Sequence, residues 1–297
     1  MRDNQLFSPK QVGHALGVSE ASIKRWVDKG KIDCVKTTGG HRKIPLYSLV
    51  EYIHKHNKQL VNPEALNIPK STGRVKDKMK QSALALRKSF QECDEFKIRG
   101  IIYDLYLSGK TPQEIFDDLM APALHQLGCD WEAGTVDCFQ ERRTIQICIR
   151  TLYGFDSFFP QPEDDAPLAI LGTLSNDPYT IPVIMTEVCL RALGWRTGFL
   201  GNDIPHDSYC KAIEMYKPQL AIVSMSALYD EIQLVENLLD IEETAVKQNC
   251  MLVLGGRSVP ELAPQKLKKS LFVYSMANFL EQTSELHKFS EMLKKKA

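Results

Sequence analysis

Polar and glycine residues follow three apolar segments that we predict to be buried parallel strands. A carboxylate and a phenol follow the first, in "LGTLSNDPYTIPVIM"; hydroxyls follow another, in "VSMSA", and a glycine pair a third, in "VLGGRS". Open α/β sheets bind ligands where the carboxyl ends of their strands meet. The missing side chains of paired glycines would let a ligand lie against the backbone. The candidate ligand-binding residues are Asp177, Tyr179, Ser224, Ser226, Gly255 and Gly256.

A tryptophan and a glutamate, Trp131 and Glu141, are separated by nine residues in "CDWEAGTVDCFQER". The pattern places the tryptophan just before a helix and the glutamate inside it. The alternative is that Trp131 caps the core of a helical bundle and that Glu141 is ordinary helix surface. The eight cysteines are scattered and contain no CxxC pair, which is typical of small buried hydrophobes. We therefore predict no metal site built from cysteine.

Cations gather near the N-terminus, where residues 1–60 contain eleven Lys or Arg and five Asp or Glu. Because the whole chain has 37 of each kind, the basic excess is confined to one module on a mildly acidic body. Such a module suits a nucleic-acid partner, whose phosphates and guanine edges accept hydrogen bonds from basic side chains. The alternative is a protein-binding module with solvated charges. The candidate DNA-binding residues are Ser22, Lys24, Arg25, His41, Arg42 and Lys43.

The N-terminal part of the chain has the pattern of a winged helix-turn-helix that would position these side chains. Ser8 and Ser19 can cap two short helices, and Gly17 suits the sharp turn between them. Extended stretches over 32–37 and 41–44 flank a Gly-Gly hairpin turn, and a further helix follows. The second helix would enter a DNA groove, and the hairpin would form the wing.

The rest of the chain divides by its periodicity into a helical part and a part in which strands alternate with helices. The helical part predicts a four-helix bundle, and the alternation predicts a doubly wound parallel sheet of five strands. The expected fold class is multidomain α and α/β, with a Rossmann-like second half. The predicted segments are a winged helix-turn-helix over 1–56, a linker over 57–75, the bundle over 76–157, a linker over 158–167 and the α/β domain over 168–297.

Bulk composition is that of an ordinary globular protein, with 43% hydrophobic and 25% charged residues in 297. No apolar run approaches the ~18 residues that a membrane span needs, and the first residues have no apolar core typical of a secretory signal. We therefore expect a cytoplasmic protein without a membrane partner.

The winged helix over residues 7–55, with its "TTGGHRKI" hairpin, resembles that of MerR-type transcription regulators. The resemblance implies a dimer bound to double-stranded operator DNA, because one such module offers a small contact. That family's long dimerising coiled coil is missing, since the following segment has prolines and no heptads. Homo-oligomers would therefore form through the bundle and the α/β domain.

The order of winged helix, bundle and α/β domain is similar to that of light-responsive MerR-type repressors of the CarH/LitR kind, which bind cobalamin. In them the bundle motif reads Trp, nine residues, Glu-His, and the tryptophan covers the upper face of the corrin. Here Arg142 stands in place of that histidine. The sheet motif reads Asp/Glu-x-His-x-x-Gly, with the histidine binding cobalt and the acid orienting its ring. The present chain has Asp177, but Tyr179 and Pro182 stand in place of the histidine and the glycine.

These departures predict a transcription regulator, a repressor, that works without histidine-ligated cobalamin and without any cofactor. Two cofactor alternatives stay open: cobalamin ligated by its own base, and haem ligated by Tyr179, since phenolate suits ferric iron. A further alternative is an antirepressor that acts through protein–protein contacts. An enzymatic corrinoid carrier for methyl transfer is disfavoured, because the lower histidine is absent and a helix-turn-helix is present.

Overall fold

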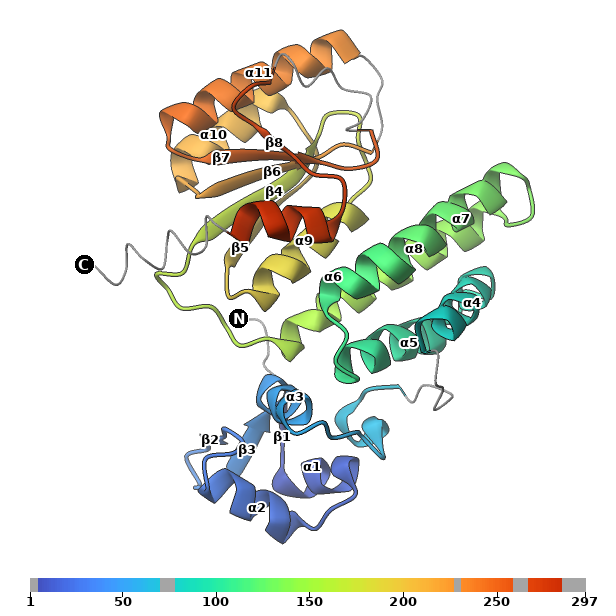
Figure 1. The fold of residues 1–297 in the computed structure, drawn as a ribbon, viewed down its shortest axis with the longest axis vertical. Helices are drawn as coiled ribbons and strands as arrows, with labels where there is room; N and C mark the ends of the chain where they lie inside the picture. The colour runs from blue at the N-terminus through green and yellow to red at the C-terminus, as the bar shows by residue number, and fades with distance from the viewer. Residues whose placement is uncertain (1–4, 70–77, 227–230, 259–266, 285–297) are drawn as a thin grey trace. The chain divides into compact units, whose positions relative to one another are not determined.

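The computed structural model describes residues 5–69, 78–226, 231–258 and 267–284. The chain divides into two compact units, residues 1–160 and 161–297. The first is largely helical, and the second is built around a parallel sheet (Figure 1). Among the described residues, no helix is both long and apolar enough to cross a membrane.

The first unit begins with two short helices, α1 (Pro9–Leu16) and α2 (Glu20–Asp28), as predicted. Ser8 closes a capping box with Gln11, and the Ser19 hydroxyl accepts the backbone N–H of Ser22. Gly17 has a φ of 69°, the left-handed conformation that the turn requires. These local signals confirm the helix-turn-helix.

A three-stranded sheet and a third helix complete the winged module. Its strands are β1 (Leu6–Phe7), β2 (Val35–Lys36) and β3 (Arg42–Pro45), in the order β1-β3-β2, and α3 (Leu46–Lys55) follows. β2 is shorter than the predicted 32–37, and β1 was not predicted. Two residues are too short a run to show alternation in sequence, so β1 forms only because β3 offers its edge.

The predicted linker 57–75 is described only as far as residue 69, and residues 70–75 lie outside the described part. The described part packs on the winged module. It contains the short helix η1 (Pro63–Leu66), and the Ala15 carbonyl accepts the backbone N–H groups of Val61 and Asn62 at 2.8 and 3.1 Å. The side chains of Leu66 and Ile68 are buried. Apolar burial therefore orders a stretch whose polar composition indicates a linker.

The bundle contains α4 (Lys78–Gln91), α5 (Glu95–Leu107), α6 (Pro112–Ile115), the π-helical turn η2 (Phe116–Met120), α7 (Ala121–Glu132), α8 (Cys138–Gly154) and η3 (Phe155–Phe158). Segments α6, η2 and α7 continue one another, so the helices form four rods, as predicted. Thr111 and Glu114 form the expected capping box at the start of α6. Aromatic rings of Tyr103, Tyr106 and Phe155 pack edge to face in the core.

The second unit confirms the predicted five-stranded parallel sheet. Its strands are β4 (Leu168–Leu174), β5 (Arg196–Ile204), β6 (Leu220–Ser224), β7 (Met251–Gly255) and β8 (Leu271–Phe272). Their order is β5-β4-β6-β7-β8, so the chain builds outward in opposite directions from β4. The switch point lies between β4 and β6, where ligands bind in folds of this kind.

Helices cover both faces of this sheet (Figure 1). One face packs on α10 (His206–Tyr216) and α11 (Glu231–Lys247), with Tyr209 and Leu238 fully buried. The other packs on α9 (Ile181–Ala192) and on residues 276–284, which are helical as far as they are described. Apolar side chains therefore cover β4, β6 and β7 on both sides, which is why their sequences read as continuous apolar runs.

Candidate functional site

The candidate DNA-binding residues on α2 differ in how free their polar atoms are. The Ser22 hydroxyl lies 3.0 Å from that of Ser19 and belongs to the helix cap. The Lys24 ammonium pairs with the Glu20 carboxylate at 2.7 Å, one helical turn away. Arg25 is exposed and has no acidic partner among the described residues. Arg25 is therefore the side chain of α2 best placed to reach a phosphate or a base edge.

The candidate residues of the wing lie on or beside strand β3. His41 is exposed at the hairpin turn, where its backbone N–H donates to the Thr37 hydroxyl at 3.2 Å. The Arg42 guanidinium pairs with the Asp28 carboxylate at the end of α2, with an N–O distance of 2.6 Å. Lys43 is half-buried and has no ion-pair partner in the described part of the chain. The sequence interpretation missed Asp28, whose pairing with Arg42 attaches the wing to the second helix.

Trp131 and Glu141 lie at one end of the bundle, on either side of the turn between α7 and α8. Trp131 belongs to the last turn of α7 and is 43% exposed, so it does not cap the bundle core. Glu141 lies in the first turn of α8, and its carboxylate is 3.4 Å from the Arg142 guanidinium. The pair belongs to the first unit, whereas the candidate residues of the sheet belong to the second.

Asp177 is the centre of a hydrogen-bonded loop after β4. It is 4% exposed, and its two carboxylate oxygens accept the backbone N–H groups of Tyr179 at 3.0 Å and of Ser226 at 2.5 Å. Ser226 follows the end of β6, so the second bond crosses the switch point of the sheet. Two accepted N–H groups are what a buried carboxylate needs to replace its lost hydration.

Thr173 is a residue of this loop that the sequence interpretation missed. Its hydroxyl donates to the backbone carbonyl of Asp177 at 2.5 Å and accepts the backbone N–H of Asp203 at 3.1 Å. The Asp203 carboxylate in turn accepts the backbone N–H of Asn176 at 2.6 Å. A threonine at the end of an otherwise apolar strand is the signal that could have revealed this network.

Two serine hydroxyls at the end of β6 are buried without a partner among the described residues. These are the Oγ atoms of Ser224 and Ser226. Ser224 is 5% exposed. Buried hydroxyls are nearly always satisfied in folded proteins, so such a pair marks a place that a polar ligand group or a water would complete.

The glycine pair after β7 is explained by packing within the chain. Gly256 has a φ of 109°, and a Cβ there would collide with the carbonyl oxygen of Met225 and lie 2.6 Å from its backbone nitrogen. Met225 itself donates its N–H to the Gly255 carbonyl at 2.7 Å. The chain's own backbone therefore occupies the space that we expected a ligand to use beside Gly256.

The loop between β4 and α9 does not fit a cobalt-ligating histidine. No histidine stands in it, Tyr179 is 46% exposed, and both oxygens of Asp177 already accept backbone N–H groups. Elsewhere in the described part of the second unit the only histidine is His206, whose Nε2 lies 3.6 Å from the Asp240 carboxylate. The donor set therefore lacks the neutral imidazole that this mode of cobalamin binding requires.

Comparison with known proteins agrees with this architecture. Residues 6–57 match the family model described as a helix-turn-helix domain. The fold is similar to that of the monomethylamine corrinoid protein of Methanosarcina barkeri, with a TM-score of 0.58 and 14% identity over 70% of this chain and 99% of that one. The chain therefore contains a helix-turn-helix domain, and 70% of it has a fold similar to that of a corrinoid protein.

The chain is also similar to the HTH-type transcriptional repressor CarH of Myxococcus xanthus. The two are 24% identical over 148 residues, which are 50% of this chain and 48% of the repressor. The match thus spans about half the length of this relative.

Proposed function

We propose that this chain is a DNA-binding transcriptional repressor that works without histidine-ligated cobalamin. The observation that carries the proposal is the basic surface of the winged module. Arg25 is exposed on the second helix, and Lys43 lies on the wing without an acidic partner among the described residues. The similarity to CarH supports the repressor role. The Asp177 loop supports independence from the histidine-ligated cofactor.

The repressor acts as a homo-oligomer on double-stranded operator DNA. A single winged module makes a contact too small for tight, specific binding, and two modules on a pseudo-palindrome double that contact. The bundle and the α/β module are the parts of the chain large enough to hold two copies together. The fold of the bundle and the α/β module serves assembly, and the repressor needs no catalytic activity from them.

A second candidate function is a sensor whose sheet module takes a ligand in another way. The buried hydroxyls of Ser224 and Ser226, which have no partner in the part of the chain that the structure describes, favour it, because a polar ligand would satisfy them. Cobalamin ligated by its own base is one such ligand, and haem bound through Tyr179 is another. A third candidate, an antirepressor that contacts protein alone, would have no use for the cations of the winged module.

Salt-dependent DNA binding tests the main proposal. A duplex selected from a random-sequence pool is titrated with the full-length chain at several salt concentrations. Reversing Arg25 and Lys43 to glutamate should weaken binding and reduce the slope of log affinity against log salt by about one per lost phosphate contact. Lys211→Glu, on an exposed position of α10, is the control. An unchanged slope in the doubly reversed variant would contradict direct DNA contact and favour the antirepressor.

A visible absorption spectrum tests the cofactor. The purified protein is measured before and after incubation with adenosylcobalamin in the dark, followed by gel filtration. A colourless protein that still binds DNA supports the proposal. A retained corrin band would overturn it in favour of the cobalamin sensor, and a Soret band in untreated protein would favour haem, with Tyr179→Phe as the next variant.

A further inference from the structure

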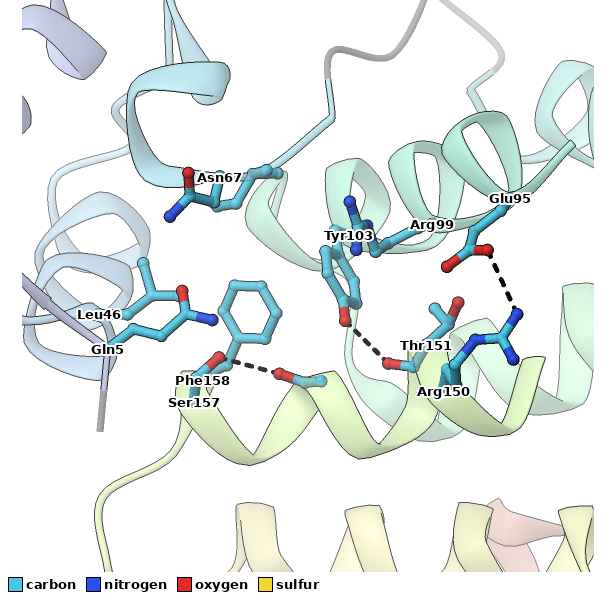
Figure 2. A pocket seen from close by; sticks show the side chains of 12 residues that line it. Gln5, Leu46, Asn67, Glu95, Arg99, Tyr103, Arg150, Thr151, Ser157 and Phe158 are labelled. Atoms are coloured by element: carbon cyan, nitrogen blue, oxygen red, sulfur yellow. Dashed lines mark hydrogen bonds and ion pairs between the residues drawn. The ribbon is translucent and has the colours of Figure 1, made fainter. Parts of the chain in front are cut away.

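A cavity of about 110 Å³ lies inside the first unit, between the winged module and the bundle (Figure 2). This volume holds a few waters or one small ion and is too small for a nucleotide or a corrin. Gln5 and Leu46 line it from the winged module, and Asn67 follows η1. Arg99 and Arg150 line it from α5 and α8.

One guanidinium nitrogen at this cavity is buried without a hydrogen-bond acceptor among the described residues. The Nε atom of Arg99 is buried and has no hydrogen-bond partner among the described residues. The guanidinium carbon of Arg99 lies 5.9 Å from the centroid of the Phe96 ring. A buried N–H without an acceptor costs about 1–3 kcal/mol, and more on a charged group, so the position calls for an acceptor.

Of the three charged side chains that line the cavity, Arg99 is the one without an ion pair in the described part of the chain. The Arg150 guanidinium pairs with the Glu95 carboxylate at 3.2 Å. The Tyr103 hydroxyl donates to the Thr151 carbonyl at 2.8 Å, and burial raises the pKa of Tyr103, so the phenol stays neutral. Figure 2 shows Arg99 and Tyr103 side by side on the wall that α5 forms.

We propose that this cavity binds a small oxyanion, a phosphate or carboxylate group, on the guanidinium of Arg99. The planar fork of arginine matches such groups with two parallel hydrogen bonds, and the volume suits an ion of that size. The site goes beyond the proposed repressor function, because it does not depend on contact with DNA.

Because of its position, an anion bound at this site would affect how the winged module is held against the bundle. Its walls come from both the winged module and the bundle, which also meet where His54 Nε2 lies 2.8 Å from the Tyr106 carbonyl oxygen. A bound anion would add a contact across that junction. A ligand that binds only the folded arrangement stabilises it by mass action.

Calorimetric titration of the full-length chain with inorganic phosphate, at constant ionic strength, tests the site. Wild type should bind one phosphate per chain with a Kd below about 1 mM. Arg99→Gln should weaken that binding at least tenfold, whereas Arg143→Gln, an exposed arginine of α8, should change it less than twofold. No saturable binding by wild type, or equal affinity in Arg99→Gln, would overturn the proposal.

A conservative variant and a competing anion complete the test. Arg99→Lys keeps the positive charge at the cavity but loses the fork, and it too should bind phosphate at least tenfold more weakly. It stands in for Arg99→Gln if the latter fails to give a native circular dichroism spectrum. Displacement of phosphate by acetate would assign the site to carboxylates, and resistance to acetate would assign it to phosphates.

Discussion

The carboxylate of Asp177, just after β4, accepts a hydrogen bond from the backbone N–H of Ser226, just after β6. These two strands are neighbours at the switch point, so the bond ties together the two loops between which sheets of this kind bind ligands. The sequence resemblance predicts at this position an acid that orients a metal-binding histidine. Here the acid holds its own loop closed against the neighbouring strand.

Replacing Asp177 should therefore destabilise the second unit. Asp177→Ala leaves two backbone N–H groups without their acceptor and should lower the free energy of unfolding in urea by about 3 kcal/mol. Ser226→Ala is the matched control, because it keeps the backbone N–H and removes a hydroxyl that has no partner among the described residues. The control should change stability by less than about 1 kcal/mol. Equal losses in the two variants would contradict this role of Asp177.

Gly256→Ala should be far more costly than Gly201→Ala. Both glycines have a positive φ, 109° and 117°, so each substitution carries a backbone penalty of about 1–3 kcal/mol. Only at Gly256 does an added Cβ meet the backbone of Met225, while nothing lies within 4 Å of the one at Gly201. Thermal or urea unfolding should show a difference of about 2 kcal/mol or more between the variants. Similar losses would mean that the Met225 contact is not tight.

Asp28→Asn should strengthen DNA binding if the winged module contacts DNA as proposed. The change frees the Arg42 guanidinium from its ion pair and removes a negative charge from the end of α2. The pair is partly exposed, so stability should change by no more than about 1 kcal/mol. Fluorescence anisotropy should show higher affinity and a salt slope that rises by up to about one. Asp118→Asn, an exposed position of η2, is the control, and an unchanged affinity in Asp28→Asn would contradict the prediction.

The capping box of α6 should give the bundle a stability that is lost in acid. Hydrogen bonds from Lys110 and Thr111 hold the pKa of Glu114 at about 2, below its ordinary value of 4.5. A lowered carboxylate pKa stabilises the fold above the ordinary pKa, and that stabilisation is lost as the pH falls toward the folded value. The difference in unfolding free energy between wild type and Glu114→Gln should thus be constant above about pH 5 and shrink toward pH 2.

Urea unfolding of wild type and Glu114→Gln at several pH values checks the predicted loss of this stability difference in acid. Glu132→Gln, at the exposed end of α7, is the control for general acid effects. A difference for Glu114→Gln that stays constant down to pH 2 would contradict the assigned role of the carboxylate.

The helices and buried strands of this fold could be predicted from the sequence because the residues that specify them lie close together in the chain. A helix begins where a side chain such as that of Ser8, Ser19 or Thr111 satisfies the first free N–H groups, and these residues are visible in the chain. The three central strands, β4, β6 and β7, are buried apolar runs that can be recognised without knowledge of their neighbours. The chemical groups that follow the carboxyl ends of the strands, a carboxylate, a phenol and two hydroxyls, are equally visible in the sequence.

What these residues do was decided only by the tertiary structure. Asp28 and Arg42 are fourteen residues apart, and Asp177 and Ser226 are forty-nine apart, so their pairing depends on how the strands and helices pack. Gly256 lies against Met225 only because β6 and β7 are neighbours. The sequence determined which groups are present and which local elements carry them. Packing decided which of them meet, because hydrogen bonds and ion pairs depend on distances of a few ångströms that no local pattern encodes.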